Sequence, residues 1–199
     1  MADISAQKVK ELRERTGAGM MECKNVLVET DGDVEKAIAL IRERGQAMAA
    51  KKAGRDAREG IVASYIHAGD RLGVLIEVNS ETDFVARNDE FKDLVKKLAM
   101  HVAGLAPIYT TIESIPAAEL EAKKADLLAD EETQKKPEHI RPQIIEGQLK
   151  KWYQSVVLYE QPFRDTDQKV SDLITDAIAK IGENIRVRRF VRYQLGEDI

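Results

Sequence analysis

Hydrophobic residues in the first 44 positions recur at helical spacing. The clearest stripe is in the third of three apolar runs, where Val34, Ala37, Ile38 and Ile41 stand at i, i+3, i+4 and i+7. Polar or glycine-containing breaks at 16–19 and 31–33 separate the runs, and such breaks favour tight turns. The pattern therefore predicts three short helices, whose other apolar positions are Ile4, Val9, Leu12, Met20, Val26 and Leu27.

The pattern weakens after residue 44. Gly45 is predicted to end the third helix, because glycine commonly follows a last helical turn. Residues 46–58 are rich in alanine, lysine and arginine and have no wide apolar face, so we predict an exposed linker helix over 45–58. This locally basic stretch is either a solvated linker or a contact surface for a partner.

Strand-like patterns begin at residue 61. In 72–79 apolar and polar positions alternate, the period of a half-buried strand, and 61–67 is rich in strand-forming residues. Turn residues at 68–70 join the two runs, which predicts a β-hairpin. A third strand is predicted at 185–195, with one face formed by Ile185, Val187, Val191, Tyr193 and Leu195.

Helices are predicted between and after these strands. One begins near Asn88 and runs to about Gly104, and another covers 166–181 and stops at Gly182. Residues 113–161 look helical but are interrupted by three prolines. The predicted fold class is α+β: a three-helix module (1–44), a linker helix (45–58) and a core (59–199) with a small antiparallel sheet flanked by helices.

Composition narrows the functional classes. The chain of 199 residues is 43% hydrophobic, which is enough for a packed core, and its net charge of −4 disfavours direct nucleic-acid binding. No apolar run approaches the roughly 20 residues of a membrane span, and no leader peptide is evident, so we expect a cytoplasmic protein without membrane contact. The single Cys23 allows no internal disulfide and is expected to be buried.

No residue pattern in the chain predicts catalysis. There is no phosphate-binding Gly-x-x-x-x-Gly-Lys run, and residues 17–19 lack the third glycine of a dinucleotide fingerprint. His67, His101 and His139 show no metal-binding spacing, and surface or structural roles are favoured for them. We predict no catalytic residues, no cofactor and no metal site, although an enzyme whose site is dispersed along the chain is an alternative.

Two segments place hydrophobic residues where they are unexpected. Phe84 stands in a polar strand-to-helix connection at 79–88, where it either folds back into the core or projects as an interface anchor. Met20 and Met21 are adjacent on a helix and point about 100° apart. We therefore expect one to pack inside and the other to be exposed, and Arg13 to be solvated or to contact a partner.

Three runs carry a resemblance to a known family. They are Leu12–Met21 (LRERTGAGMM), Glu81–Arg87 (ETDFVAR) and Ile181–Ile185 followed by Val187-Arg188-Arg189. Together they resemble bacterial-type translation elongation factor Ts, in its short form. The resemblance implies that the first 44 residues form a ubiquitin-associated-like module. It also implies that the chain is a guanine-nucleotide exchange factor for the GTPase elongation factor Tu. Such a factor makes and breaks no bond, so the chain itself is not expected to be an enzyme.

The resemblance also assigns partner-binding residues. It implies that residues 82–85 enter the GTPase near its magnesium site, where Phe84 wedges between two helices and Asp83 lies beside it. The set matching this segment is Thr82, Asp83, Phe84 and Val85. The first module is expected to dock through Lys10, Arg13, Met20 and Met21.

A second copy of the chain is the other expected partner. Both faces of the last predicted strand carry side chains that could be buried, and a small sheet needs cover on both faces. We predict a non-covalent homodimer, sheet against sheet, unless residues 105–165 cover the sheet within a monomer. An adaptor built on the three-helix module and an RNA-binding protein are further alternatives for the function.

Overall fold

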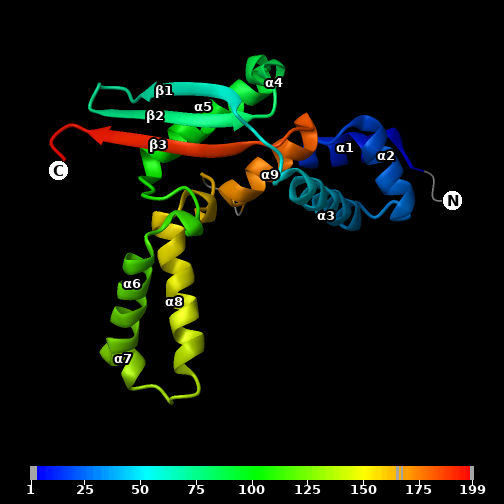
Figure 1. Cartoon of the computed structure of the whole chain (residues 1–199). Helices are drawn as coiled ribbons and strands as arrows, with labels where there is room; N and C mark the ends of the chain where they lie inside the picture. Colours follow the sequence, from blue (N-terminus) through cyan, green and yellow to red (C-terminus); the bar gives the residue numbers. More distant parts are fainter. Residues whose placement is uncertain (1–3, 165, 167, 198–199) are drawn as a thin grey trace. The chain divides into compact units, whose positions relative to one another are not determined.

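The computed structural model (Figure 1) describes residues 4–164, 166 and 168–197. These residues form two compact units. The first unit contains residues 4–61, 79–92 and 173–186. The second contains residues 62–78, 93–164, 166, 168–172 and 187–197, which include most of the sheet. The chain therefore passes between the two units several times.

Three helices open the first unit: α1 (Ala6–Thr16), α2 (Met20–Glu29) and α3 (Val34–Lys52). The Ser5 side chain caps α1 by accepting from the backbone N–H of Lys8 at 3.3 Å. Their apolar stripes meet in one core, as the spacing predicts. The buried residues of this core are Val9, Leu12, Cys23, Val26, Leu27, Ala37 and Ile38.

The prediction that Gly45 ends the third helix is wrong, because α3 continues through it to Lys52. Gly45 is buried, and a Cβ atom at this position would lie 3.5 Å from the Cβ of Ala179. Gly45 therefore lies where α3 packs against α9 (Val170–Ile181), with room for a side chain no larger than a methyl group, and it does not end the helix. The linker is helical only to Lys52, and residues 55–58 are not in a helix.

The first unit also contains a short helix that the sequence did not predict. The connection between strand and helix at 79–88 includes α4 (Asp83–Arg87), with Thr82 as its N-cap. The next helix, α5, runs from Asp89 to Leu105, within one residue of its predicted ends.

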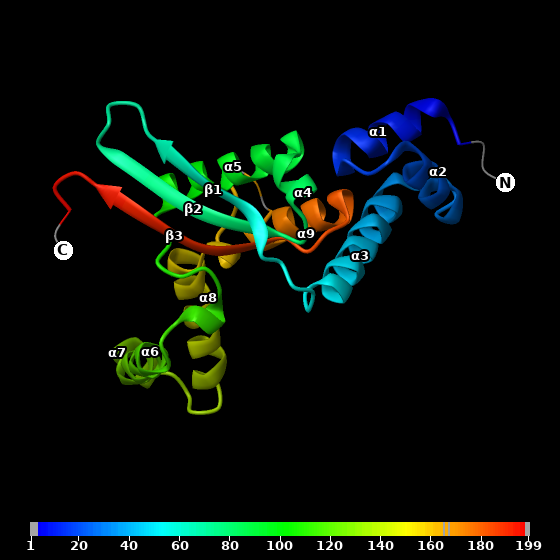
Figure 2. The ribbon, with the colours of Figure 1, turned by 45° about the horizontal axis from the view of Figure 1, so that its top comes forward.

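The sheet of the second unit has, among the described residues, three strands in the order β1-β2-β3: Glu59–Ile66, Leu72–Ser80 and Arg186–Gln194. The first two form the predicted hairpin, and the antiparallel arrangement confirms the α+β fold class. Helix α5 lies along one face of the sheet (Figures 1 and 2). The core on that side includes Val74, Ile76, Val78, Val95, Leu98 and Val102.

The face predicted for the third strand is wrong in one respect. Val187 is buried, whereas Val191 and Tyr193 are exposed. The burial alternation shifts by one residue between Val187 and Phe190, because Arg188 and Arg189 are both exposed in succession.

A helical hairpin completes the second unit. Helices α6 (Ala117–Ala129) and α8 (Arg141–Val156) lie side by side, with the short α7 (Glu131–Gln134) between them in sequence (Figure 2). The prolines divide this stretch into separate helices, as predicted: Pro116 is the N-cap of α6, and Pro142 lies in the first turn of α8. Short 3-10 turns flank the hairpin at Ile112–Ser114 and Leu158–Glu160.

Candidate partner-binding site

Phe84 projects from the first unit. Its side chain is 80% exposed, the highest value for a large hydrophobic side chain in the part of the chain that the structure describes. The alternative in which Phe84 folds back into the core is therefore wrong. Ala86 is the buried residue of α4, and Asp83 forms an ion pair with Arg87 at 2.8 Å along the same helix.

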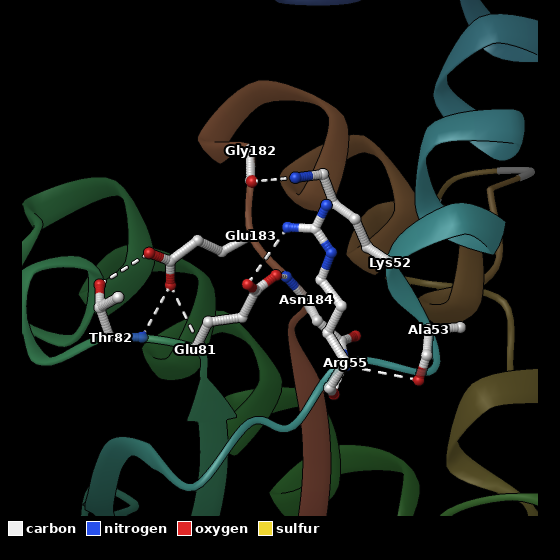
Figure 3. Close-up of polar contacts among 8 residues, drawn as sticks. All are labelled: Lys52, Ala53, Arg55, Glu81, Thr82, Gly182, Glu183 and Asn184. Carbon is white, nitrogen blue, oxygen red and sulfur yellow. Dashed lines mark hydrogen bonds and ion pairs between the residues drawn. The ribbon is translucent and has the colours of Figure 1, made fainter.

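The carboxylate of Glu183 holds the start of this segment (Figure 3). It accepts hydrogen bonds from the backbone N–H groups of Glu81 and Thr82, both at 3.0 Å, and from the Thr82 hydroxyl at 2.6 Å. The Thr82 hydroxyl in turn accepts from the backbone N–H of Val85 at 3.4 Å. One carboxylate thus fixes two peptide groups and the side chain that caps α4.

A second carboxylate makes the reciprocal contact. Glu81 accepts from the backbone N–H of Asn184 at 2.6 Å and pairs with Arg55 at 3.3 Å. The pKa of Glu81 is lowered, chiefly because the Asn184 N–H stabilises the charged form; burial opposes the shift, and Arg55 adds to it. The two segments therefore hold each other through backbone donors and side-chain acceptors.

The end of α3 and the residues that follow it complete this arrangement. The side-chain amide of Asn184 donates to the carbonyl of Arg55 at 2.9 Å, and the Lys52 ammonium donates to the carbonyl of Gly182. Gly182 ends α9 with a φ of +85°, a conformation that suits glycine and turns the chain so that Glu183 faces Thr82 (Figure 3). Three parts of the chain that are distant in sequence, 52–55, 81–82 and 182–184, thus meet next to the start of α4.

The four predicted docking residues lie on the three-helix module. Met20 and Met21 are 51% and 66% exposed, so the prediction that one of them packs inside is wrong. Both belong to the first turn of α2, before the buried positions begin at Cys23. Lys10 and Arg13 are exposed on α1, and Lys10 is 3.8 Å from Glu14. This set and residues 82–85 occupy different parts of the first unit.

Sequence reasoning missed Glu183, Asn184 and Arg55. The pairings join positions 26 to 131 residues apart, and such pairings leave no periodic trace in the sequence. Among the described residues no cluster of three or more potential metal ligands occurs. None of the described helices is long and apolar enough to cross a membrane.

An exposed aromatic side chain on a hydrogen-bonded support is suited to anchor a contact with another protein, because aromatic residues are frequent hot spots of protein interfaces. Comparison with known proteins identifies the family to which the chain belongs. The family model for elongation factor TS matches residues 2–197. Elongation factor Ts of Desulforamulus reducens is 54% identical over 200 residues, covering 100% of this chain and 92% of the relative.

Other relatives agree. Elongation factor Ts of Heliobacterium modesticaldum is 54% identical and covers 98% of this chain and 92% of its own length. That of Thermoanaerobacter sp. (strain X514) is also 54% identical, covering 98% of this chain and 97% of the relative. The chain belongs to the elongation factor Ts family, which confirms the resemblance found in the sequence.

Proposed function

We propose that this chain promotes GDP release from elongation factor Tu through two surfaces, the segment 82–85 and the three-helix module. The role itself follows from the family: elongation factor Ts is a nucleotide exchange factor for elongation factor Tu in translation elongation, and not a catalytic enzyme. Because that partner acts in protein synthesis, we place the chain in the cytoplasm.

The observation that carries the proposal is the exposure of Phe84 on a fixed support. Burying a phenylalanine side chain contributes roughly 1.5–3 kcal/mol. If Phe84 fits only a displaced arrangement of the GTPase, that free energy favours a state that holds magnesium and GDP poorly. Thr82, Asp83 and Val85 accompany it near the magnesium site. The coupling is reciprocal, so an incoming nucleotide weakens the bound factor by the same ratio.

The three-helix module supplies docking in this proposal. Exposed Met20 and Met21 offer adaptable apolar contacts, and Lys10 and Arg13 offer charge and hydrogen-bond donors. We propose the division predicted from the sequence: docking module 1–44, linker 45–58 and core 59–199. Because α3 crosses the first of these boundaries, the connection there is a continuous helix rather than a hinge.

Replacing Phe84 with alanine tests the proposal. Phe84→Ala should weaken exchange by about 2–4 kcal/mol, or roughly thirty- to thousand-fold, since an interface anchor is lost. Melting should be nearly unchanged because the side chain is already exposed. The measurement is release of fluorescent GDP from purified elongation factor Tu. Leu128→Ala, which also truncates an exposed hydrophobic side chain, is the control.

A folded Phe84→Ala variant with full exchange activity would refute the anchor. An equal loss in Leu128→Ala would show that the assay responds to general surface hydrophobicity.

We further propose that two copies associate through the face of the sheet opposite α5. Side chains exposed on this face and at its end include Val62, Ile66, Leu75, Val191, Tyr193 and Leu195. A groove of about 800 Å³ near the hairpin turn is lined by several of them. The single cysteine is buried, so the association is non-covalent.

Sedimentation equilibrium at micromolar concentration tests this dimer. A mass that rises towards twice the 22.3 kDa of the chain is expected, with no effect of reductant. A mass at the monomer value throughout the range would rule the dimer out. Tyr193→Glu places a charge on the exposed face and should return the protein to monomer.

A further inference from the structure

We propose that Glu183 is a positioning residue for nucleotide exchange: its carboxylate fixes the backbone from which Phe84 projects. The proposal rests on the exchange role of Phe84 given above. It concerns a side chain about 100 positions away in the sequence, just after α9.

The hydrogen bonds of Glu183 are directed at the root of α4. One carboxylate oxygen accepts from the backbone N–H groups of Glu81 and Thr82, and the other accepts from the Thr82 hydroxyl. These two N–H groups precede the first turn of α4 and have no acceptor within that helix. Bonds to an ionised acceptor are stronger than those between neutral groups. Glu183 therefore supplies what the helix itself cannot.

Helix α4 itself is short and contributes little buried surface. It is five residues long, and Ala86 is its buried residue. So short a helix is not stable by its own hydrogen bonds. The orientation of Phe84 thus depends on how the residues before α4 are anchored.

Other hydrogen bonds and an ion pair should keep residues 80–82 in place when the Glu183 side chain is removed. Glu81 still accepts from the backbone N–H of Asn184 and still pairs with Arg55. Ser80, which is fully buried, donates its hydroxyl to the carbonyl of Thr82 at 3.0 Å. Loss of Glu183 should therefore loosen the direction of α4 without unfolding the first unit.

Amide hydrogen exchange of the free protein tests the positioning directly. Glu183→Ala should speed exchange at residues 81–87 about tenfold or more, because the local opening becomes easier. Glu183→Gln keeps an acceptor oxygen at the same reach and should restore most of the protection. The control is Glu90→Ala, which removes an exposed ion pair with Lys180 in the same unit. Unchanged protection in Glu183→Ala would overturn the proposal.

Nucleotide release then tests the consequence. With elongation factor Tu loaded with fluorescent GDP, Glu183→Ala should lower the release rate at saturation about tenfold, while the half-saturating concentration changes less than about twofold. Docking through α1 and α2 is untouched, which is why the two parameters separate. Glu183→Asp, whose carboxylate is withdrawn by one methylene group, should behave like alanine and serves as the second variant if Glu183→Ala does not fold.

A double variant separates positioning from direct contact. If Glu183 acts through the Phe84 segment, Glu183→Ala should cost much less in a Phe84→Ala background than in the original chain. An undiminished effect there would mean that Glu183 acts by another route, and the proposal would fall. If Phe84→Ala alone retains full exchange, the proposed function fails, while the hydrogen-exchange result on Glu183 still stands by itself.

Discussion

The three-helix module and the segment at 81–87 present their candidate binding residues by different means. The module has its own core of seven buried side chains, and its helices α1 and α3 are capped by the adjacent Ser5 and Asp33. The segment has Ala86 buried in α4 and depends on the Glu183 carboxylate, the backbone N–H of Asn184 and the guanidinium of Arg55. One surface is supported by local packing, the other by long-range polar contacts.

This difference has a physical consequence. Packing in a small core is cooperative, so a cavity there weakens all three helices together. Polar contacts at a short helix act on direction, and removing one leaves the others in place. Substitutions in the module should therefore lower its free energy of unfolding and the affinity for elongation factor Tu. Substitutions in the segment should lower the rate of nucleotide release.

The largest expected effect is on the module core. Leu12 is fully buried, so Leu12→Ala should lower the free energy of unfolding of the module by about 2–5 kcal/mol. In a core of this size that is a large share of the total. Amide hydrogen exchange should show lost protection in α1, α2 and the first turns of α3, with the sheet unchanged.

Val28→Ala is the matched control, since Val28 lies on the exposed side of α2. If Leu12→Ala also removes protection from the sheet, the module is not an independent folding element and the contrast drawn above is wrong.

Elements with strong periodicity could be predicted from the sequence. The alternation at 72–79 predicted β2 to within one residue. The apolar stripe of α5 predicted both ends of that helix to within one residue. Gly45 misled because glycine signals both helix ends and close packing, and only the contact with Ala179 distinguishes the two. The prolines of the hairpin were a better guide, since Pro142 suits a first helical turn and marks where α8 begins.

The candidate site was less predictable than the fold. Pattern alone could not decide whether Phe84 was buried, because its neighbours are compatible with either outcome. The contacts of Glu183 could not be predicted at all, since they depend on how α9 and the end of β2 meet in space. Family resemblance pointed to Phe84 as an anchor but gave no account of what holds it.

A smaller effect is expected from the docking residues. Arg13→Ala and Met20→Ala should each weaken binding to elongation factor Tu about five- to tenfold, near 1–1.4 kcal/mol, because each removes one exposed contact. The rate of GDP release at saturating factor should be unchanged. Titration of the release rate measures both quantities.

Arg42→Ala and Met48→Ala are the controls, since both side chains are exposed on α3 outside the proposed docking set. A fall in the saturating rate for Arg13→Ala would contradict a pure docking role and blur the distinction between the two regions.

The smallest effect concerns the place where α3 contacts α9. A Cβ at Gly45 would lie 3.5 Å from that of Ala179, an ordinary van der Waals distance, so Gly45→Ala should fit. It removes the cost of a glycine in a helix interior, about 0.5–1 kcal/mol, and should raise the melting temperature by about 1–4 °C. Gly45→Leu has no such room beside Ala179 and should lower it instead. If both variants melt lower, α3 and α9 are packed more tightly than this distance implies, and the helix that joins the module to the linker is under a constraint that glycine alone relieves.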